Sequence, residues 1–218
     1  MQVAIDGPAS SGKSTISKLI AKENHFVYLD TGAMYRVVTL AVLRNKISID
    51  DHEAIEKLVQ TIEIGFSMKD GKQSVFMNGE DVTDEIRSVE VTKNVSAVSA
   101  IKEVRTRLVH LQQEIAENHS IMDGRDIGTV VLPQAEIKIF LVASVEERAK
   151  RRFIENQEKG IEMSYEELVE DIRRRDHIDS TRKESPLRKA EDAIEIDTTT
   201  MTIEDVVKTV TALIQKNQ

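Results

Sequence analysis

Residues 7–14 read Gly-Pro-Ala-Ser-Ser-Gly-Lys-Ser and match the pattern G-x-x-x-x-G-K-[ST] in full. A short apolar run, residues 3–5, precedes this pattern, and Ile16, Leu19 and Ile20 follow it at helical spacing. Glycine and small side chains let consecutive backbone N–H groups curl around a phosphate, and the following helix adds the positive end of its dipole. The sequence therefore predicts a nucleotide phosphate-binding loop between a strand and a helix.

Two side chains at the end of this loop extend the prediction. Lys13 supplies a positive charge to the β and γ phosphates of a nucleotide, and the Ser14 hydroxyl is suited to ligate Mg²⁺. A GTPase is disfavoured, because residues 45–48 read Asn-Lys-Ile-Ser where the guanine motif would read Asn-Lys-x-Asp. A motor-type ATPase is disfavoured, because residues 120–126 read Ser-Ile-Met-Asp-Gly-Arg-Asp and lack the expected glutamate. These observations favour a small kinase.

The composition limits the class of protein further. The 218 residues carry 30 Lys and Arg against 38 Asp and Glu, a formal charge of −8, and contain no cysteine. The length fits one large domain or a main domain with an insertion. Thiolate chemistry is excluded, and the acidic charge argues against non-specific nucleic-acid binding. Residues 173–189 differ, because seven Lys or Arg accompany three acids there and indicate a small anionic ligand.

The expected location and assembly follow from the same composition. The chain begins without a basic leader, and no apolar run approaches the roughly 20 residues of a membrane span. We therefore expect a cytoplasmic protein with no membrane partner and no nucleic-acid partner. Because no exposed apolar stripe is evident, we also expect a monomer.

Short apolar runs separated by helical patterns predict an open α/β fold. Five runs are expected to form buried strands of one parallel sheet: residues 3–5, 26–29, 121–122, 137–142 and 193–196. Helical periodicity predicts amphipathic helices that cover this sheet, around residues 16–20, 101–115 and 203–214. The pairs Ser144 with Glu147 and Ser164 with Glu167 fit the capping box that begins a helix.

Two segments break the alternation of strand and helix. Residues 62–68 alternate apolar with polar or small side chains, residues 74–77 form a second strand pattern, and Asp70-Gly71 and Asn78-Gly79 offer turns. These patterns predict a small antiparallel meander inserted into the core. Residues 158–161 separate two charged helices and are interpreted as a mobile flap.

Two polar segments follow predicted strands, where ligands of open α/β sheets bind. Residues 30–36 read Asp-Thr-Gly-Ala-Met-Tyr-Arg and residues 123–128 read Asp-Gly-Arg-Asp-Ile-Gly. A turn with a helix cap explains Thr31 and Gly32 equally well. An Asp–Arg ion pair that holds the loop is an alternative for residues 123–128.

Taken in chain order, these segments resemble the bacterial cytidylate kinases, over nearly the whole chain. The matching segments are residues 7–15, 30–36, 79–82, 86–87, 123–131, 138–141, 147–152 and 175–182. The resemblance implies a P-loop nucleoside monophosphate kinase fold, with a five-stranded parallel sheet flanked by helices, a small antiparallel insert and a helical lid. It also implies a division into core (1–61), monophosphate-binding insert (62–98), core (99–147), lid (148–163) and core (164–218).

The resemblance implies that the protein transfers the γ-phosphoryl group of MgATP to CMP or dCMP. ATP would bind to the phosphate loop, Gly7, Pro8, Ala9, Ser10, Ser11, Gly12, Lys13, Ser14 and Thr15, with Ser14 as the Mg²⁺ ligand. Lys13 and the lid arginines Arg148, Arg151 and Arg152 would surround the transferring group, because guanidinium groups meet phosphate oxygens bidentately. Asp123 would orient metal-bound water; a strand-end cap explains it equally well.

The resemblance also assigns the acceptor site. Its residues would be Thr31, Arg36, Ser96, Arg105, Arg125, Asp126, Arg175, Asp179 and Arg182. Arg36, Arg125 and Arg182 make sense as clamps on the monophosphate. A carboxylate such as Asp126, assisted by Ser96, favours the N4 amine of cytosine over the oxygen of uracil. Arg105 would donate to the ring and Asp179 would contact the sugar.

Two other functions stay open on the sequence. A P-loop kinase for another small acceptor, such as UMP, AMP or a shikimate-like metabolite, would keep the same donor loop. A nucleotide-dependent RNA-binding protein would use the basic residues 173–189, but the acidic balance and only eight aromatic residues disfavour it. The sequence does not separate CMP from dCMP, nor single out one lid arginine.

Overall fold

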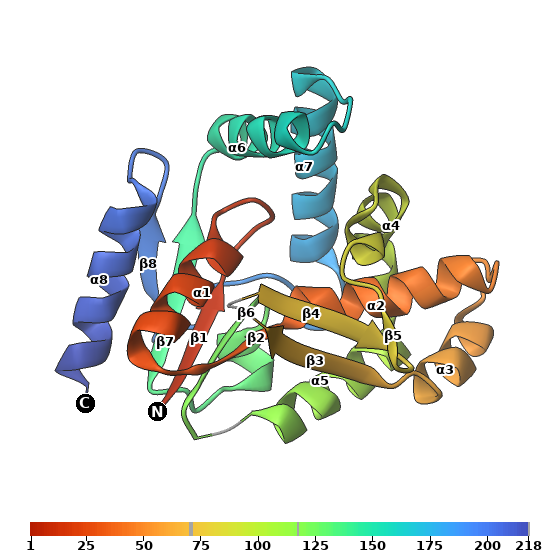
Figure 1. Cartoon of the computed structure of the whole chain (residues 1–218), viewed down its shortest axis with the longest axis horizontal. Coiled ribbons are helices and arrows are strands. Elements are labelled where there is room, and N and C mark those ends of the chain that lie inside the picture. The colour runs from red at the N-terminus through yellow and green to blue at the C-terminus, as the bar shows by residue number, and fades with distance from the viewer. Residues whose placement is uncertain (70–71, 117, 218) are drawn as a thin grey trace. The chain divides into compact units, whose positions relative to one another are not determined.

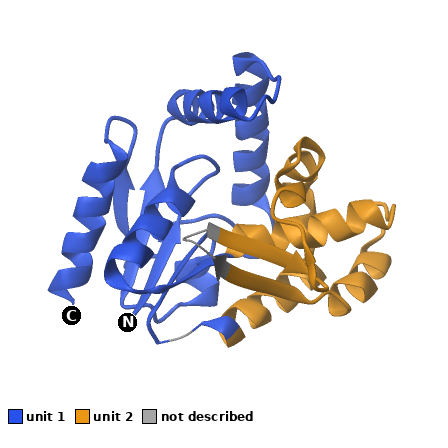
Figure 2. Cartoon of the chain, viewed as in Figure 1, with its two compact units in different colours: residues 1–30, 115–218 blue, residues 31–114 orange. Residues whose placement is uncertain are grey.

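The computed structural model describes residues 1–69, 72–116 and 118–217. The chain forms two compact units, one made of Met1–Asp30 with Ile115–Gln218 and the other of Thr31–Glu114 (Figure 2). The second unit contains the whole of residues 62–98, the predicted insert. The predicted turn at Asp70-Gly71 lies outside the described residues. No helix in the described part of the chain is long and apolar enough to cross a membrane.

The first unit is built on a parallel sheet (Figure 1). Five strands of the described residues form it, in the order β2-β6-β1-β7-β8. Their bounds are Gln2–Asp6 (β1), Val27–Asp30 (β2), Ser120–Gly124 (β6), Ile137–Val142 (β7) and Ile194–Asp197 (β8). The predicted strands and their parallel pairing are confirmed.

Burial of the strands differs from the prediction at the two edges of the sheet. The side chains of β6 in the interior of the sheet are all buried, whereas Val27 in β2 is 42% exposed and Ile194 in β8 is 44% exposed. A strand at a sheet edge has a neighbour on one side only, so the prediction of full burial was wrong for these two strands.

Two helices pack their apolar faces against this sheet. They are α1 (Lys13–Asn24) and α8 (Ile203–Lys216), which also contact each other. Ile16 and Ile20 of α1 share one buried cluster with Val210 and Ile214 of α8 and with strand residues such as Ile139. The helical spacing in the sequence predicted both faces, because apolar residues three or four apart lie on one side of a helix.

Helices α6 (Val145–Glu158) and α7 (Tyr165–Thr181) pack together at the top of Figure 1, around a buried Ala149. Residues 158–161, predicted as a flap, end α6 in a compact turn. Gly160 has φ of 66°, and the Ile161 N–H donates to the Asn156 carbonyl over 2.9 Å. Glycine suits this left-handed position because it has no Cβ.

The two predicted capping boxes have different outcomes. At α7 the box is complete: Ser164 Oγ accepts from the Glu167 N–H, and the Glu167 carboxylate accepts from the Ser164 N–H. At α6 the Ser144 hydroxyl caps the Glu147 N–H, but the Glu147 carboxylate accepts instead from Arg151 over 3.1 Å. The prediction at Ser144 was therefore wrong for half of the box, because an arginine one turn later competes for the carboxylate.

The second unit combines four α-helices of the described residues with a small antiparallel sheet. The helices are α2 (Thr31–Arg44), α3 (His52–Gln60), α4 (Val89–Ser99) and α5 (Lys102–Ile115), and α4 packs on α2. The strands are β3 (Ile64–Lys69), β4 (Lys72–Met77) and β5 (Glu80–Asp81), in the order β3-β4-β5. Asn78 and Gly79 both have positive φ in the turn before β5, so the predicted meander is confirmed.

Loss of the complete capping box should weaken the protein. Ser164→Ala is expected to lower the free energy of unfolding by about 1 kcal/mol, because the Glu167 N–H loses its acceptor. Urea unfolding measures this value. The control Ser180→Ala, in the last turn of the same helix where the hydroxyl donates to the Asp176 carbonyl, should change it by less than about 0.5 kcal/mol. Equal effects of the two substitutions would contradict the assigned cap.

Candidate active site

The phosphate loop follows β1 and closes tightly over β7. Gly7, Ser10 and Gly12 all have positive φ, at 152°, 60° and 91°. A Cβ at Gly7 would lie 2.2 Å from the backbone oxygen of Leu141. The loop therefore requires glycine at position 7 for a close approach between two backbones.

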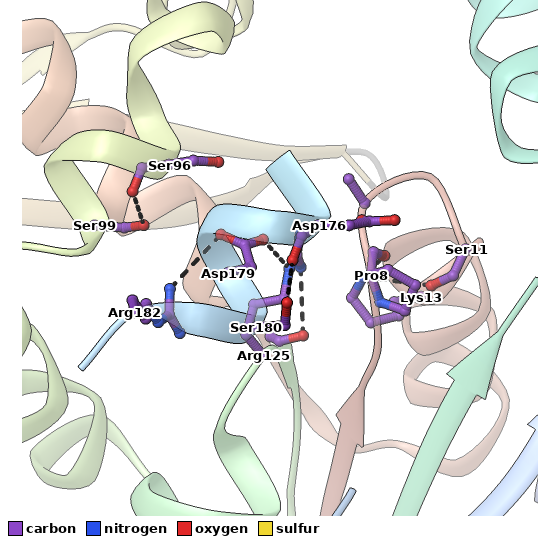
Figure 3. Close-up of polar contacts among 12 residues, drawn as sticks. Pro8, Ser11, Lys13, Ser96, Ser99, Arg125, Asp176, Asp179, Ser180 and Arg182 are labelled. Carbon is purple, nitrogen blue, oxygen red and sulfur yellow. Dashed lines mark hydrogen bonds and ion pairs between the residues drawn. The ribbon is translucent and has the colours of Figure 1, made fainter. Parts of the chain in front are cut away.

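Lys13 is the first residue of α1 and is only 5% exposed. Its Nζ donates to the Pro8 carbonyl over 2.7 Å and to Ser11 Oγ over 3.4 Å (Figure 3). Burial lowers the pKa of Lys13 most, and the charge of Arg125 lowers it further, although Asp123 opposes the shift. Because desolvation disfavours the charged ammonium, a bound phosphate would stabilise it strongly.

Three side chains meet at the end of β6. The Ser14 hydroxyl donates to one oxygen of Asp123 over 2.7 Å, and the Tyr28 hydroxyl donates to the other oxygen over 2.7 Å. Burial raises the pKa of Asp123, and the charge of Asp30 raises it further. Burial and Asp123 raise the pKa of Tyr28, so its hydroxyl keeps the proton that it donates.

The Ser14–Asp123 pair also fits a magnesium ion. Mg²⁺ prefers oxygen ligands and in phosphotransferases uses one or two carboxylates together with substrate phosphates. A hydroxyl and a carboxylate that already meet beside the phosphate loop are such a donor set. Among the described residues no cluster of three or more His, Cys, Asp or Glu offers a complete protein cage for a metal.

Asp6 is a buried polar residue that the sequence reasoning missed. It ends β1 immediately before the phosphate loop, and its carboxylate accepts from the N–H groups of Ile127 and Gly128 over 2.8 Å each. Burial raises the pKa of Asp6 to about 7, against the opposite effect of these two hydrogen bonds. The available signal was a carboxylate directly after the three apolar residues of this strand.

Asp179 of α7 pairs with two arginines of the same unit. Arg125 Nε donates to Asp179 over 2.9 Å, and Arg182 Nη1 lies 3.8 Å from the other carboxylate oxygen (Figure 3). Arg182 is also fixed by two hydrogen bonds to the Ser185 carbonyl. Burial alone would raise the pKa of Asp179, but Arg125, Arg182 and Arg175 lower it below its ordinary value.

Arg175 adds a third guanidinium to this arginine cluster, which we define as Arg125, Arg175 and Arg182. Arg175 is 9% exposed, and its Nε has no hydrogen-bond partner among the described residues. Burial lowers its pKa most, followed by the charge of Arg125. Three guanidinium groups around one carboxylate leave a net positive charge, which an anionic ligand would balance. Asp126, which is 3% exposed, follows Arg125 directly.

The second unit holds the other four predicted acceptor residues. Arg36 Nη1 donates to the Ile86 carbonyl and to Thr92 Oγ1 over 3.1 and 2.9 Å. Arg105 is buried, lies over the Tyr35 ring with 5.1 Å to its centroid, and donates to the Ser99 carbonyl. The Ser96 carbonyl accepts from Ser99 Oγ over 3.0 Å (Figure 3). Ser99 therefore connects Ser96 with Arg105. Thr31 is buried at the start of α2.

The three predicted lid arginines differ in their contacts. Arg148 is buried, pairs with Asp176 of α7 and donates to the Ala9 carbonyl in the phosphate loop over 3.1 Å. Arg151 donates to both oxygens of Thr198, a residue that the sequence reasoning also missed. Arg152 pairs with Glu155 on its own helix over 3.1 Å. Thr198 Oγ1 lies 3.4 Å from the Ser11 carbonyl and 3.2 Å from the Val142 carbonyl, and its one proton is shared between these two acceptors.

The sheet order, the loop after β1 and the buried lysine define a P-loop phosphotransferase. The cytidylate kinase family model matches residues 3–216, and the chain belongs to that family. It is 54% identical over 219 residues to the cytidylate kinase of Lactobacillus johnsonii, covering 100% of this chain and 95% of the relative. It is 55% identical over 217 residues to the cytidylate kinase of Ligilactobacillus salivarius, covering 99% and 97%.

Among solved structures, we compare one that shares the fold at low sequence identity. It is that of an uncharacterized protein from Eubacterium ventriosum, with a TM-score of 0.53, 11% identity and coverage of 99% of this chain and 98% of the other. The family match and the parallel sheet confirm the predicted fold class.

The close approach at Gly7 makes a specific prediction. Gly7→Ala should weaken ATP binding more than about tenfold and lower the melting temperature, because the new Cβ forces the loop away from Leu141. Calorimetric titration and thermal unfolding measure the two effects. Gly79→Ala is the control, since Gly79 has φ of 83° with no atom within 4 Å of the added Cβ. It should cost about 1 kcal/mol of stability from backbone strain and leave ATP binding unchanged. ATP binding that Gly7→Ala leaves intact would contradict the loop geometry.

Asp6 should make stability depend on pH. The folded protein keeps a proton on Asp6 up to a pKa of about 7, whereas the unfolded chain releases it near its ordinary value of 3.8. Between these values the folded state binds more protons, so the Asp6 contribution to stability falls as pH rises, by at most about 1.4 kcal/mol per pH unit.

Urea unfolding between pH 5 and 8 tests this prediction. The stability of the wild type relative to Asp6→Asn should decline from pH 5 to 7 and then level off, because asparagine does not titrate. Parallel stability curves over the whole range would show that the folded and unfolded pKa values of Asp6 are equal.

Proposed function

We propose that the protein transfers the γ-phosphoryl group of ATP to CMP or dCMP and releases ADP with CDP or dCDP. The observation that carries this proposal is the phosphate loop with its buried Lys13, in a chain of the cytidylate kinase family. The arginine cluster around Asp179 supports it, because this cluster suits a second anion beside the donor phosphates. ATP is the phosphoryl donor of this reaction.

The proposed chemistry requires alignment more than acid–base catalysis. A phosphate oxygen of the monophosphate attacks the γ phosphorus, and the bond from that phosphorus to the β–γ bridging oxygen breaks, so ADP leaves with the electron pair. The attacking oxygen is already anionic and needs no strong general base. The protein must hold the two nucleotides in line and balance the negative charge that spreads over the transferring group.

Lys13 and the guanidinium groups supply that balance in the proposal. Lys13 contacts the β and γ phosphates from the phosphate loop, residues 7–15, which binds ATP through its backbone N–H groups. Among the lid arginines we favour Arg148 as the one that contacts the transferring group, because it already donates to the Ala9 carbonyl of the loop. We propose that Arg151 and Arg152 also lie near the transferring group.

Ser14 and Asp123 would hold Mg²⁺ with the donor phosphates. When bound, Mg²⁺ neutralises charge on the triphosphate and fixes its conformation. Tyr28 keeps the Asp123 carboxylate in one orientation through its hydroxyl.

The acceptor residues stay as the sequence suggested. We propose that Arg36, Arg125 and Arg182 bind the monophosphate. Asp126, assisted by Ser96, would accept a hydrogen bond from the N4 amine of cytosine. Arg105 would donate to the ring, Asp179 would contact the sugar, and Thr31 and Arg175 complete the set. Arg175 suits this role because its Nε is buried without a partner among the described residues.

The proposal extends to organisation and location. Residues 62–98 would be the monophosphate-binding insert and residues 148–163 the lid, with the remaining segments, 1–61, 99–147 and 164–218, as the core. We further propose that the protein is a cytoplasmic monomer whose partners are nucleotides rather than RNA.

ADP production from MgATP tests the function directly. CMP, dCMP, UMP, AMP, GMP and shikimate are supplied separately to the same enzyme preparation. Strong turnover with CMP and dCMP, and little with the other four, is the expected result. Turnover with a different acceptor alone would keep the kinase core and overturn the choice of substrate, and silence with all six would overturn the proposed reaction.

Arg125→Ala should raise KM for CMP at least about tenfold and change KM for ATP much less, because a charge-assisted contact to the monophosphate is lost. Steady-state kinetics with each substrate varied in turn measure both constants. Arg173→Ala, which removes an exposed arginine of α7 paired with Glu170, is the control and should leave both constants unchanged. Equal effects of Arg125→Ala on CMP and ATP would remove Arg125 from the acceptor site.

Asp126→Asn should narrow the preference for CMP over UMP by about tenfold, because an amide can serve both the N4 amine and the uracil oxygen. The ratio of kcat/KM for the two acceptors is the measurement. Glu195→Gln removes an exposed carboxylate that pairs with Lys189 and should leave the ratio unchanged. An unaltered ratio in Asp126→Asn would refute its role in reading the base.

A further inference from the structure

Asp6 holds the loop after β6 from the neighbouring central strand. β1 pairs with β6 on one side and β7 on the other, which brings Asp6 opposite Gly124 and Phe140. The Asp6 side chain is 4% exposed. One carboxylate oxygen accepts from the Ile127 N–H and the other from the Gly128 N–H, both over 2.8 Å.

The two N–H groups that Asp6 binds begin a short helical turn, η2 (Ile127–Val131). The first N–H groups of such a turn have no acceptor inside it, and a carboxylate placed there is favoured by the local dipole. The Asp126 carbonyl accepts from Val130 and Val131, which closes the turn. The position of the turn is therefore set by a side chain outside it.

The turn fits closely against Asp6. A Cβ at Gly128 would lie 3.4 Å from an Asp6 carboxylate oxygen and 3.1 Å from Lys138 Cδ. This spacing leaves little room for the turn to move while both hydrogen bonds persist. The bidentate contact consequently fixes both the distance and the direction of the loop relative to β1.

The contacts of Asp6 connect the segment proposed to bind ATP with the segment proposed to bind the phosphoryl acceptor. Gly7, the first residue of the phosphate loop, follows Asp6, and Arg125-Asp126 directly precede the two N–H groups that Asp6 binds. We propose that Asp6 is a positioning residue for the phosphoryl acceptor, whose carboxylate fixes Arg125 and Asp126 relative to the phosphate loop. This inference rests on the proposed function.

Asp6→Asn tests the inference with a substitution of nearly the same shape. The asparagine oxygen can accept from one N–H group, but its NH₂ group faces the other N–H and cannot accept from it. KM for CMP should rise about tenfold and the ratio of kcat/KM for CMP over UMP should fall, while KM for ATP changes less than about threefold. A loss of stability alone would move neither the KM split nor the base preference.

Glu136→Gln is the matched control. Glu136 also accepts a backbone N–H of β1, that of Gln2 over 2.6 Å, but at the opposite end of the strand. It should leave both KM values and the base preference unchanged. Equal increases of KM for CMP and ATP in Asp6→Asn, or unchanged kinetics in a folded Asp6→Asn, would overturn the positioning role.

Hydrogen exchange of the wild type and of Asp6→Asn gives a readout that does not depend on activity. In the wild type, the amides of Ile127 and Gly128 should exchange as slowly as those of Ile121 and Met122 in β6. In Asp6→Asn, exchange at residues 127 and 128 should accelerate at least tenfold more than in β6. Fast exchange of both amides in the wild type would overturn the inference even if Asp6→Asn did not fold. Slow exchange without CMP turnover would instead count against the proposed function alone.

Discussion

The burial of a charged lysine beneath a tight loop is the interaction on which the proposed donor site of the first unit depends. Lys13 is 5% exposed, and its ammonium is held by the Pro8 carbonyl and the Ser11 hydroxyl. Removing an ammonium from water is costly unless hydrogen bonds and opposite charge compensate. The loop supplies the hydrogen bonds, and a nucleotide phosphate would supply the opposite charge at the same place. We therefore attribute the proposed phosphate-binding role of the loop to how this lysine is buried.

The loop keeps its shape because neighbouring elements hold its backbone. Gly7 approaches the Leu141 oxygen so closely that no side chain fits, and Arg148 and Thr198 donate to the carbonyls of Ala9 and Ser11. Carboxylates at the ends of β1 and β6 hold the surrounding groups: Asp6 binds two backbone N–H groups and Asp123 binds two hydroxyls. The two carboxylates at this edge of the sheet therefore accept hydrogen bonds that hold the groups around the loop in place.

The sequence predicted the features that depend on local pattern. The strands, α1, α8, the meander and the phosphate loop all follow from apolar periodicity and glycine positions within short windows. The predictions that failed depend on competition or on position in the sheet. Glu147 pairs with Arg151 instead of completing the Ser144 box, and β8 is exposed because it ends the sheet order. Neither fact can be read from residues 144–147 or 193–196 alone.

The residues that sequence reasoning missed have partners far along the chain. Asp6 binds amides more than 120 positions away, Tyr28 binds Asp123, and Thr198 binds Ser11 and Arg151. Each is a polar residue in a strand or directly after one, a weak signal that gains meaning once the strand order is known. The individual contacts of Arg148, Arg151 and Arg152 likewise required the structure, since all three fall within one helical turn and a half of the same sequence segment.

The substitution Lys13→Ala, assayed for ADP production from MgATP and CMP, tests the central claim most directly. We expect turnover to fall at least about a hundredfold while circular dichroism and urea unfolding show a folded protein, because the buried charge proposed to contact the donor phosphates is gone. Near-normal turnover in a folded Lys13→Ala protein would contradict the assignment of the phosphate loop as the donor site.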